Sequence, residues 1–288
     1  MSNPTPDEII RIAQQRIGER RATEAVVQIR RERPWRWFFV ALFAVLLAAL
    51  LFWPGAPLEW KMYAVVHGVC AQQHNIFLGE LQFPLCARNS GIYLSFLLTT
   101  LSLYAMGRGR AGGLPPWSIV ATLLLFVAIM AVDGFNSLFV DLGQPHLYPP
   151  DNLLRTLTGM GMGIAIAVIL HIVLVKTLRK DVDDLQPVLT NWWELLGIVG
   201  LNVLVLAAIY GNLSFMFWPL ALLAFFGITG VLYLVALLLT SLVMGYEGAV
   251  TDLRQLARPA VVAIVPTLLI LGSMSWLRFW LEGMGLVL

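Results

Sequence analysis

Charged side chains are scarce in this chain: they make up 12% of its 288 residues, whereas 59% of the residues are hydrophobic. Soluble domains carry roughly 25% charged residues and just under half apolar ones. The shortage of charge excludes an ordinary water-facing surface and indicates a surface that contacts lipid. The net charge of +2 is also too small to indicate a nucleic-acid partner.

Cysteines, targeting signals and catalytic motifs are sparse as well. Two cysteines are too few for a disulfide-dense scaffold. The first 33 residues mix acidic with basic side chains and resemble neither a secretory signal nor a transit peptide. No Ser-His-Asp arrangement, phosphate-cradling glycine loop or H-E-x-x-H motif is evident. The sequence therefore indicates no particular reaction, and we expect no cofactor.

Long hydrophobic runs are what the sequence has instead. A helix needs about 20 apolar residues to cross the hydrocarbon core of a membrane. Seven stretches qualify, near 35–53, 88–106, 117–138, 153–175, 192–210, 215–243 and 259–280. The sixth is long enough to tilt, or to break at Gly227 or Gly230. The pattern predicts an all-α polytopic integral membrane protein with about seven transmembrane helices.

Lysine and arginine predict the orientation, because cytoplasmic loops carry an excess of both. With a cytoplasmic N-terminus, 15 of the 19 basic residues fall inside. Only Lys61, Arg88, Arg155 and Arg278 fall outside. We therefore predict a multi-pass protein of the cell (cytoplasmic or inner) membrane, with its N-terminus in the cytoplasm and its C-terminus outside.

Composition divides the chain into a basic arm (1–34), a four-helix membrane unit (35–175) and a three-helix apolar unit (176–288). Apolar residues recur at helical spacing in the arm and predict an amphipathic helix over 5–33. That helix either lies on the anionic inner leaflet or docks a cytoplasmic partner. The outer segment, 54–86, is too apolar for a free loop. We expect it to lie in the interface or to fold back over the helix ends.

Cys70 and Cys86 both fall on the predicted outer side, where an oxidising compartment permits a disulfide. Two buried free thiols and a redox-active pair are the alternatives. With His67 and His74, the cysteines also form a candidate ligand set for zinc, although the spacing matches no zinc-finger pattern. We predict the disulfide, and no metal.

Three charged residues fall at the outer ends of predicted spans, where a charge costs a few kcal/mol unless it is paired. Arg88 begins the second span, Asp133 lies late in the third, and Arg155 lies early in the fourth. One acid neutralises one arginine, which leaves the other facing two helix N-termini that also attract anions. This predicts a site for phosphate or carboxylate. The alternative is a structural charge network, in which Asn152 is only a helix cap.

The run P-L-C-A-R-N-S-G-I-Y at 84–93, with C-A-Q at 70–72 and N-L-L-R-T-L-T-G at 152–159, resembles an uncharacterised family. Its members are bacterial and archaeal predicted membrane proteins with a domain of unknown function. This sequence departs from the family at Ala71, where His is usual, and at Asn89, where Cys is frequent. Both departures remove potential metal ligands. The resemblance implies no activity, but it does imply that the charged and cysteine positions belong to one unit.

Together these features predict a polar pocket at the outer ends of the second to fourth spans that binds an anionic or lipid head group. The candidate binding residues are Arg88, Arg155, Asp133, Asn152, Asn89 and Gln72. Membrane lipids are the expected partners. One alternative is an accessory subunit of a larger membrane complex, or of a homo-oligomer. Another is a thiol-disulfide redox membrane protein.

Overall fold

α-Helices make up nearly all the regular structure. The computed structural model describes residues 6–70 and 74–285. The helices in these ranges are α1 (Pro6–Phe52), α2 (Leu58–Val66), α3 (Ala87–Ala105), α4 (Trp117–Asp141), α5 (Asn152–Leu178), α6 (Trp192–Tyr210), α7 (Phe217–Val243) and α8 (Ala257–Gly283). The strands are β1 (Asn75–Leu78), β2 (Leu81–Cys86), β3 (Ala111–Gly113) and β4 (Asp183–Pro187).

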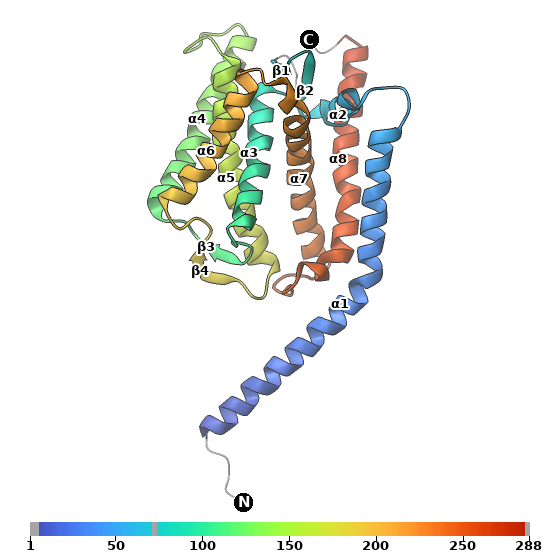
Figure 1. Ribbon diagram of the computed structural model, residues 1–288, viewed down its shortest axis with the longest axis vertical. Helices are drawn as coiled ribbons and strands as arrows, with labels where there is room; N and C mark the ends of the chain where they lie inside the picture. Colours follow the sequence, from blue (N-terminus) through green and yellow to red (C-terminus); the bar gives the residue numbers. More distant parts are fainter. Residues whose placement is uncertain (1–5, 71–73, 286–288) are drawn as a thin grey trace, which may run out of the picture.

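The long helices run between two ends of the molecule (Figure 1). Helix α2 and the antiparallel β1–β2 hairpin lie at one end, which we call the capped end. Strands β3 and β4 pair in parallel at the opposite end, from which the N-terminal arm also extends. We call this second end the arm end. The strands were not predicted, because each is only three to six residues long.

Six helical segments in the described part of the chain are long and apolar enough to cross a membrane. They are Ile29–Phe52, Trp117–Asp141, Asn152–Leu178, Trp192–Tyr210, Ser214–Val243 and Leu253–Gly283. The prediction of an all-α polytopic membrane protein is confirmed. The predicted sixth span contains one unbroken helix, α7, so neither glycine interrupts it. The predicted span at 88–106 is α3, which is not among the six.

Helix α3 is more polar than the six candidate spans, and it packs inside the bundle. Ser90, Ser95 and Thr99 on this helix are fully buried. Helix α3 packs against α5 and α7, which shield it from the surroundings. A helix enclosed by other helices needs less apolar surface than one that faces lipid. The number of crossings therefore depends on α3, and a seventh crossing remains a prediction.

Glycines bring the neighbours of α3 unusually close to its backbone. A Cβ atom added at Gly159 of α5 would overlap the carbonyl oxygen of Arg88, and one at Gly163 would overlap that of Ile92. A Cβ atom at Gly227 of α7 would likewise overlap an α3 carbonyl. Small residues at helix interfaces permit such close approach within membranes. These contacts fix α3 and α5 against each other just below the capped end.

The predicted outer segment folds back over the helix ends, as expected. Its apolar side chains form one cluster with the first turns of α7, comprising Met62, Val66, Ile76, Leu78, Phe83, Leu85, Phe217, Leu220 and Ala221. The predicted disulfide between Cys70 and Cys86 is present. It joins the segment after α2 to the last residue of β2, and therefore to the start of α3.

The arm and the first span form a single helix, α1, which continues through Pro34. The N-terminal part of α1 points away from the bundle (Figure 1). Glu32 is the junction between the arm and the bundle. Its buried carboxylate accepts hydrogen bonds from the hydroxyl of Tyr246 and the backbone N–H of Arg258, both at 2.8 Å.

Basic residues at the arm end are largely paired with acids. Arg108 binds Glu194, Arg110 Nε lies 3.1 Å from Asp181, and Lys176 Nζ lies 2.9 Å from Asp184. The basic loop segments from which we predicted the orientation lie together at this end of the molecule (Figure 1).

Candidate functional site

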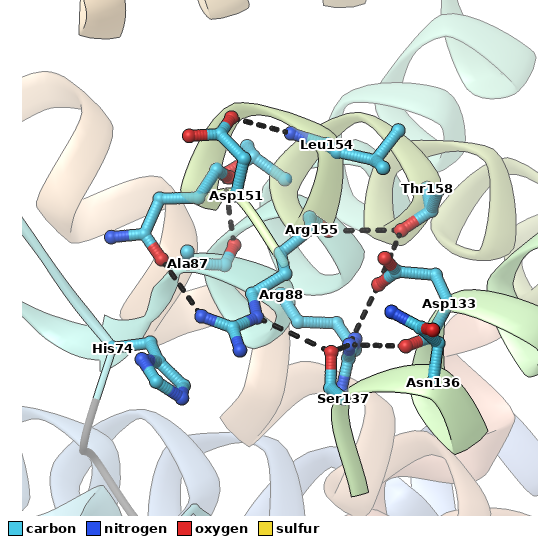
Figure 2. Close-up of polar contacts among 12 residues, drawn as sticks. His74, Ala87, Arg88, Asp133, Asn136, Ser137, Asp151, Leu154, Arg155 and Thr158 are labelled. Atoms are coloured by element: carbon cyan, nitrogen blue, oxygen red, sulfur yellow. Dashed lines mark hydrogen bonds and ion pairs between the residues drawn. The ribbon is translucent and has the colours of Figure 1, made fainter. Parts of the chain in front are cut away.

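The three predicted charges lie together at the capped end, each on a different helix. Arg88 is the second residue of α3, Asp133 lies two turns before the end of α4, and Arg155 lies in the first turn of α5. Helix α5 begins there because Asp151 caps it: its carboxylate accepts hydrogen bonds from the N–H groups of Leu153 at 2.8 Å and Leu154 at 3.3 Å. Figure 2 shows the resulting polar cluster.

Arg88 and Asp133 form the central ion pair. Arg88 Nη2 donates to Asp133 Oδ2 at 2.6 Å and to Ser137 Oγ at 2.8 Å. Asp133 is almost completely buried and also accepts from the Tyr148 hydroxyl at 3.0 Å and the Thr158 hydroxyl at 3.3 Å. Burial, together with the hydrogen bond to Asp133 and the charge of that carboxylate, raises the pKa of Tyr148. The tyrosine therefore stays protonated and donates to the acid.

Asn136 fixes the loop that brings Tyr148 to this pair. Its Oδ1 accepts from the N–H groups of Leu147 at 2.7 Å and Tyr148 at 3.3 Å, and its Nδ2 donates to the Tyr148 carbonyl at 2.9 Å. Tyr148 and Ser137 are not among the residues predicted from the sequence. The spacing of Ser137 was informative, because it lies four residues after Asp133 and therefore on the same helix face. Nothing local in the sequence indicated Tyr148.

Arg155 is placed differently from Arg88. It is only 4% exposed, yet no carboxylate lies within 4 Å of its guanidinium among residues 6–70 and 74–285. It makes two long hydrogen bonds, from Nε to Ser137 Oγ at 3.4 Å and from Nη1 to Asn152 Oδ1 at 3.3 Å. A guanidinium has five N–H donors, so the two hydrogen bonds do not use all the donors of this arginine.

A pocket of about 400 Å³ opens beside Arg155. It is lined by His74, Val140, Asp141, Pro150, Asp151, Asn152 and Arg155. His74 lies beside the Arg155 guanidinium, whereas Asp151 lies farther from it, near Leu154 at the start of α5 (Figure 2). His74 Nε2 lies 3.8 Å from Asp141 Oδ1, and this nitrogen is buried without a hydrogen-bond partner in the described chain. Burial and then the charge of Arg155 lower the pKa of His74, against the opposing effect of Asp141.

The charge balance of this site differs from the prediction. One acid facing two arginines predicts one positive charge in excess. Asp141 and Asp151 also line the pocket, so the two arginines face three carboxylates. The expected excess of positive charge is therefore wrong for the cluster as a whole. The expected role of the α5 N-terminus is wrong too, because Asp151 already accepts from its N–H groups.

The remaining predicted residues are dispersed. Asn152 lies on the pocket wall and donates from Nδ2 to the Asn75 carbonyl at 3.4 Å. Asn89 instead points toward the segment after α2, where its Nδ2 lies 3.5 Å from the Val69 carbonyl oxygen. Gln72 lies outside the described residues. The structure thus brings together four of the six candidate binding residues, while Asn89 faces elsewhere.

The alternative zinc ligands do not assemble. The sulfur atoms of Cys70 and Cys86 are bonded to each other. His67 is buried between the rings of Tyr63 and Phe279, with its Nε2 2.8 Å from Glu282 Oε2. In the described part of the chain, no group of three or more His, Cys, Asp or Glu side chains is arranged to hold a metal ion.

Comparison with known proteins identifies one family. The model of a family described as predicted membrane proteins of unknown function, DUF2085, matches residues 70–169. This segment extends from the first cysteine into α5 and contains Arg88, Asp133 and Arg155. The predicted resemblance to an uncharacterised membrane protein family is confirmed. No curated protein and no solved structure is significantly similar to the chain.

Proposed function

We propose that this polytopic membrane protein binds the phosphate or carboxylate group of a membrane lipid in the pocket beside Arg155. The observation that carries the proposal is a buried guanidinium, on the wall of a pocket, with no carboxylate within 4 Å in the described chain. A buried charge is usually paired, and the guanidinium fork matches phosphate and carboxylate geometry.

The neighbouring ion pair supports this assignment of roles. Arg88 satisfies Asp133 at 2.6 Å, so Asp133 does not need Arg155. Ser137 accepts from both arginines, at 2.8 and 3.4 Å, and holds the two guanidinium groups in one arrangement. We therefore assign the Arg88–Asp133 pair a structural role in the site, and Arg155 the role of binding the ligand.

The position of the pocket along the helices favours a lipid head group as its ligand. It lies between the last turn of α4 and the first turn of α5, at the ends of two segments that are apolar enough to span a membrane. Lipid phosphates lie at this level of a bilayer. We further propose that the capped end is outside, that the N-terminus is cytoplasmic and the C-terminus outside, and that the membrane is the cell (inner) membrane.

The disulfide fits a structural role better than redox exchange. Cys86 is only 8% exposed and joins a strand to the first turn of α3. We propose that the bond holds the segment between α2 and α3 in place next to Arg88. An accessory subunit or homo-oligomer remains the alternative, with the apolar outer faces as contact surfaces.

Lipid retention tests the proposal. Wild-type protein purified in mild detergent should retain phosphate-bearing lipid in native mass spectrometry, and Arg155→Gln should lose most of it. Arg278→Gln is the matched control, because Arg278 is also at the capped end but binds Glu282 at 2.7 Å. Equal lipid retention by wild type and Arg155→Gln would contradict the proposal.

Orientation has its own test. Single cysteines replace Glu80, in the hairpin turn of the capped end, and Asp184, an exposed residue of the arm end. A membrane-impermeant maleimide should label only the first in intact cells. Labelling of the second alone reverses the proposed orientation.

A further inference from the structure

The pocket beside Arg155 contains groups of both signs. Asp141 and Asp151 line it together with Arg155. Asp133, the third acid of the cluster, already forms an ion pair with Arg88 at 2.6 Å. Among the described residues, the pocket itself therefore presents one cation and two anions. A ligand that carried only negative charge would meet Arg155 favourably but would be repelled by both carboxylates.

Neither carboxylate is fully paired by the described residues. Asp141 is 44% exposed, and its only basic neighbour within 4 Å in the described chain is His74, at the long distance of 3.8 Å. Asp151 uses Oδ2 for the two N-cap hydrogen bonds, and its Oδ1 accepts no hydrogen bond from the described residues. The imidazole Nε2 of His74 is also buried without a hydrogen-bond partner in the described residues.

We infer that the ligand is a zwitterion, with a phosphate or carboxylate on Arg155 and a primary ammonium group between Asp141 and Asp151. This inference rests on the proposed function. An ammonium group donates up to three hydrogen bonds and satisfies the acids that an anionic ligand leaves unpaired. A quaternary ammonium has no N–H to donate, so a choline head group lacks this interaction. The volume of about 400 Å³ lies within the range of small-molecule sites.

Two sources supply this chemistry: an ethanolamine phospholipid, and a small soluble zwitterion such as phosphoethanolamine or an amino acid. They are distinguished by adding each to the delipidated full-length protein in detergent. Native mass spectrometry compares phosphatidylethanolamine, phosphatidylcholine and phosphatidylglycerol with the same acyl chains. Thermal unfolding with phosphoethanolamine and with glycine tests the soluble source.

The wild type should bind phosphatidylethanolamine, or a soluble zwitterion, about tenfold more tightly than the choline or glycerol lipid, which corresponds to one charge-assisted hydrogen bond. The double variant Asp141→Asn, Asp151→Asn should lose this preference and favour phosphatidylglycerol. Asparagine also caps helices, so helix α5 keeps its start. Glu80→Gln removes an exposed acid of the same end as the matched control.

The possible failures are distinguishable. If phosphatidylglycerol binds as well as phosphatidylethanolamine and both depend on Arg155, the zwitterion inference is wrong and the proposed function stands. If the double variant still prefers the ethanolamine lipid, the two acids do not bind the ammonium group and the inference is also wrong. If no lipid or soluble zwitterion depends on Arg155, both proposals fail.

Discussion

Replacing each arginine of the cluster by glutamine should have very different effects on stability. Arg88 is the only charged partner of Asp133 within 4 Å in the described chain, and Asp133 is 1% exposed. Arg88→Gln therefore strands a buried carboxylate. Arg155→Gln removes a guanidinium whose hydrogen bonds are 3.3 and 3.4 Å long, and leaves the Arg88–Asp133 pair intact.

The magnitudes follow from these contacts. Removing one partner of a buried ion pair costs about 3–5 kcal/mol. Tyr148 and Thr158 still donate to Asp133 in Arg88→Gln, so we expect a loss near the lower end, about 3 kcal/mol. The two long hydrogen bonds of Arg155 are worth about 1 kcal/mol together. The difference between the two variants should therefore be about 2 kcal/mol.

Unfolding of each variant in mixed micelles, followed by circular dichroism as the denaturing detergent fraction rises, measures this difference. The double variant Arg88→Gln, Asp133→Asn completes a mutant cycle. It should be more stable than the sum of the single losses predicts, because neither partner is left charged and unpaired. If Arg155→Gln is as destabilising as Arg88→Gln, the assignment of Asp133 to Arg88 is refuted.

Three further predictions concern helix packing, the disulfide and the junction between the arm and the bundle. Gly163→Leu should destabilise the bundle by several kcal/mol because its side chain overlaps the α3 backbone, whereas Gly134→Leu, which has open space, should cost little in the same unfolding assay. Cys86→Ser should cost about 3 kcal/mol in the chain-entropy model, and mass spectrometry of unreduced wild-type protein should find no alkylated cysteine. Burial, and then Glu32, raise the pKa of Tyr246 to about 12. The tyrosine thus contributes stability that is complete below pH ~10 and is lost as the pH rises through about 12, and Tyr246→Phe should remove this alkaline loss; an identical pH dependence in the variant would contradict it.

The spanning segments were predictable because hydropathy is a local property. The predicted stretch 192–210 coincides with Trp192–Tyr210, and 117–138 lies within Trp117–Asp141. Gathering of the basic segments at one end was also predictable, because loops between consecutive crossings alternate sides. Helix α3 shows the limit of this reasoning. Its polarity reflects enclosure by α5 and α7, which no local window reports.

The candidate site was only half predictable. Arg88, Asp133 and Arg155 could be assigned to one end of the bundle from the chain alone, because their positions within the spans fix their depth. That Arg88 pairs with Asp133, that Arg155 faces a pocket, and that Asp141 and Asp151 share it became visible only in the folded protein. Depth follows from distance along a helix, whereas pairing depends on how each helix is rotated about its axis. That rotation is set by packing contacts such as those of Gly159 and Gly163 with α3, which join residues far apart in the chain.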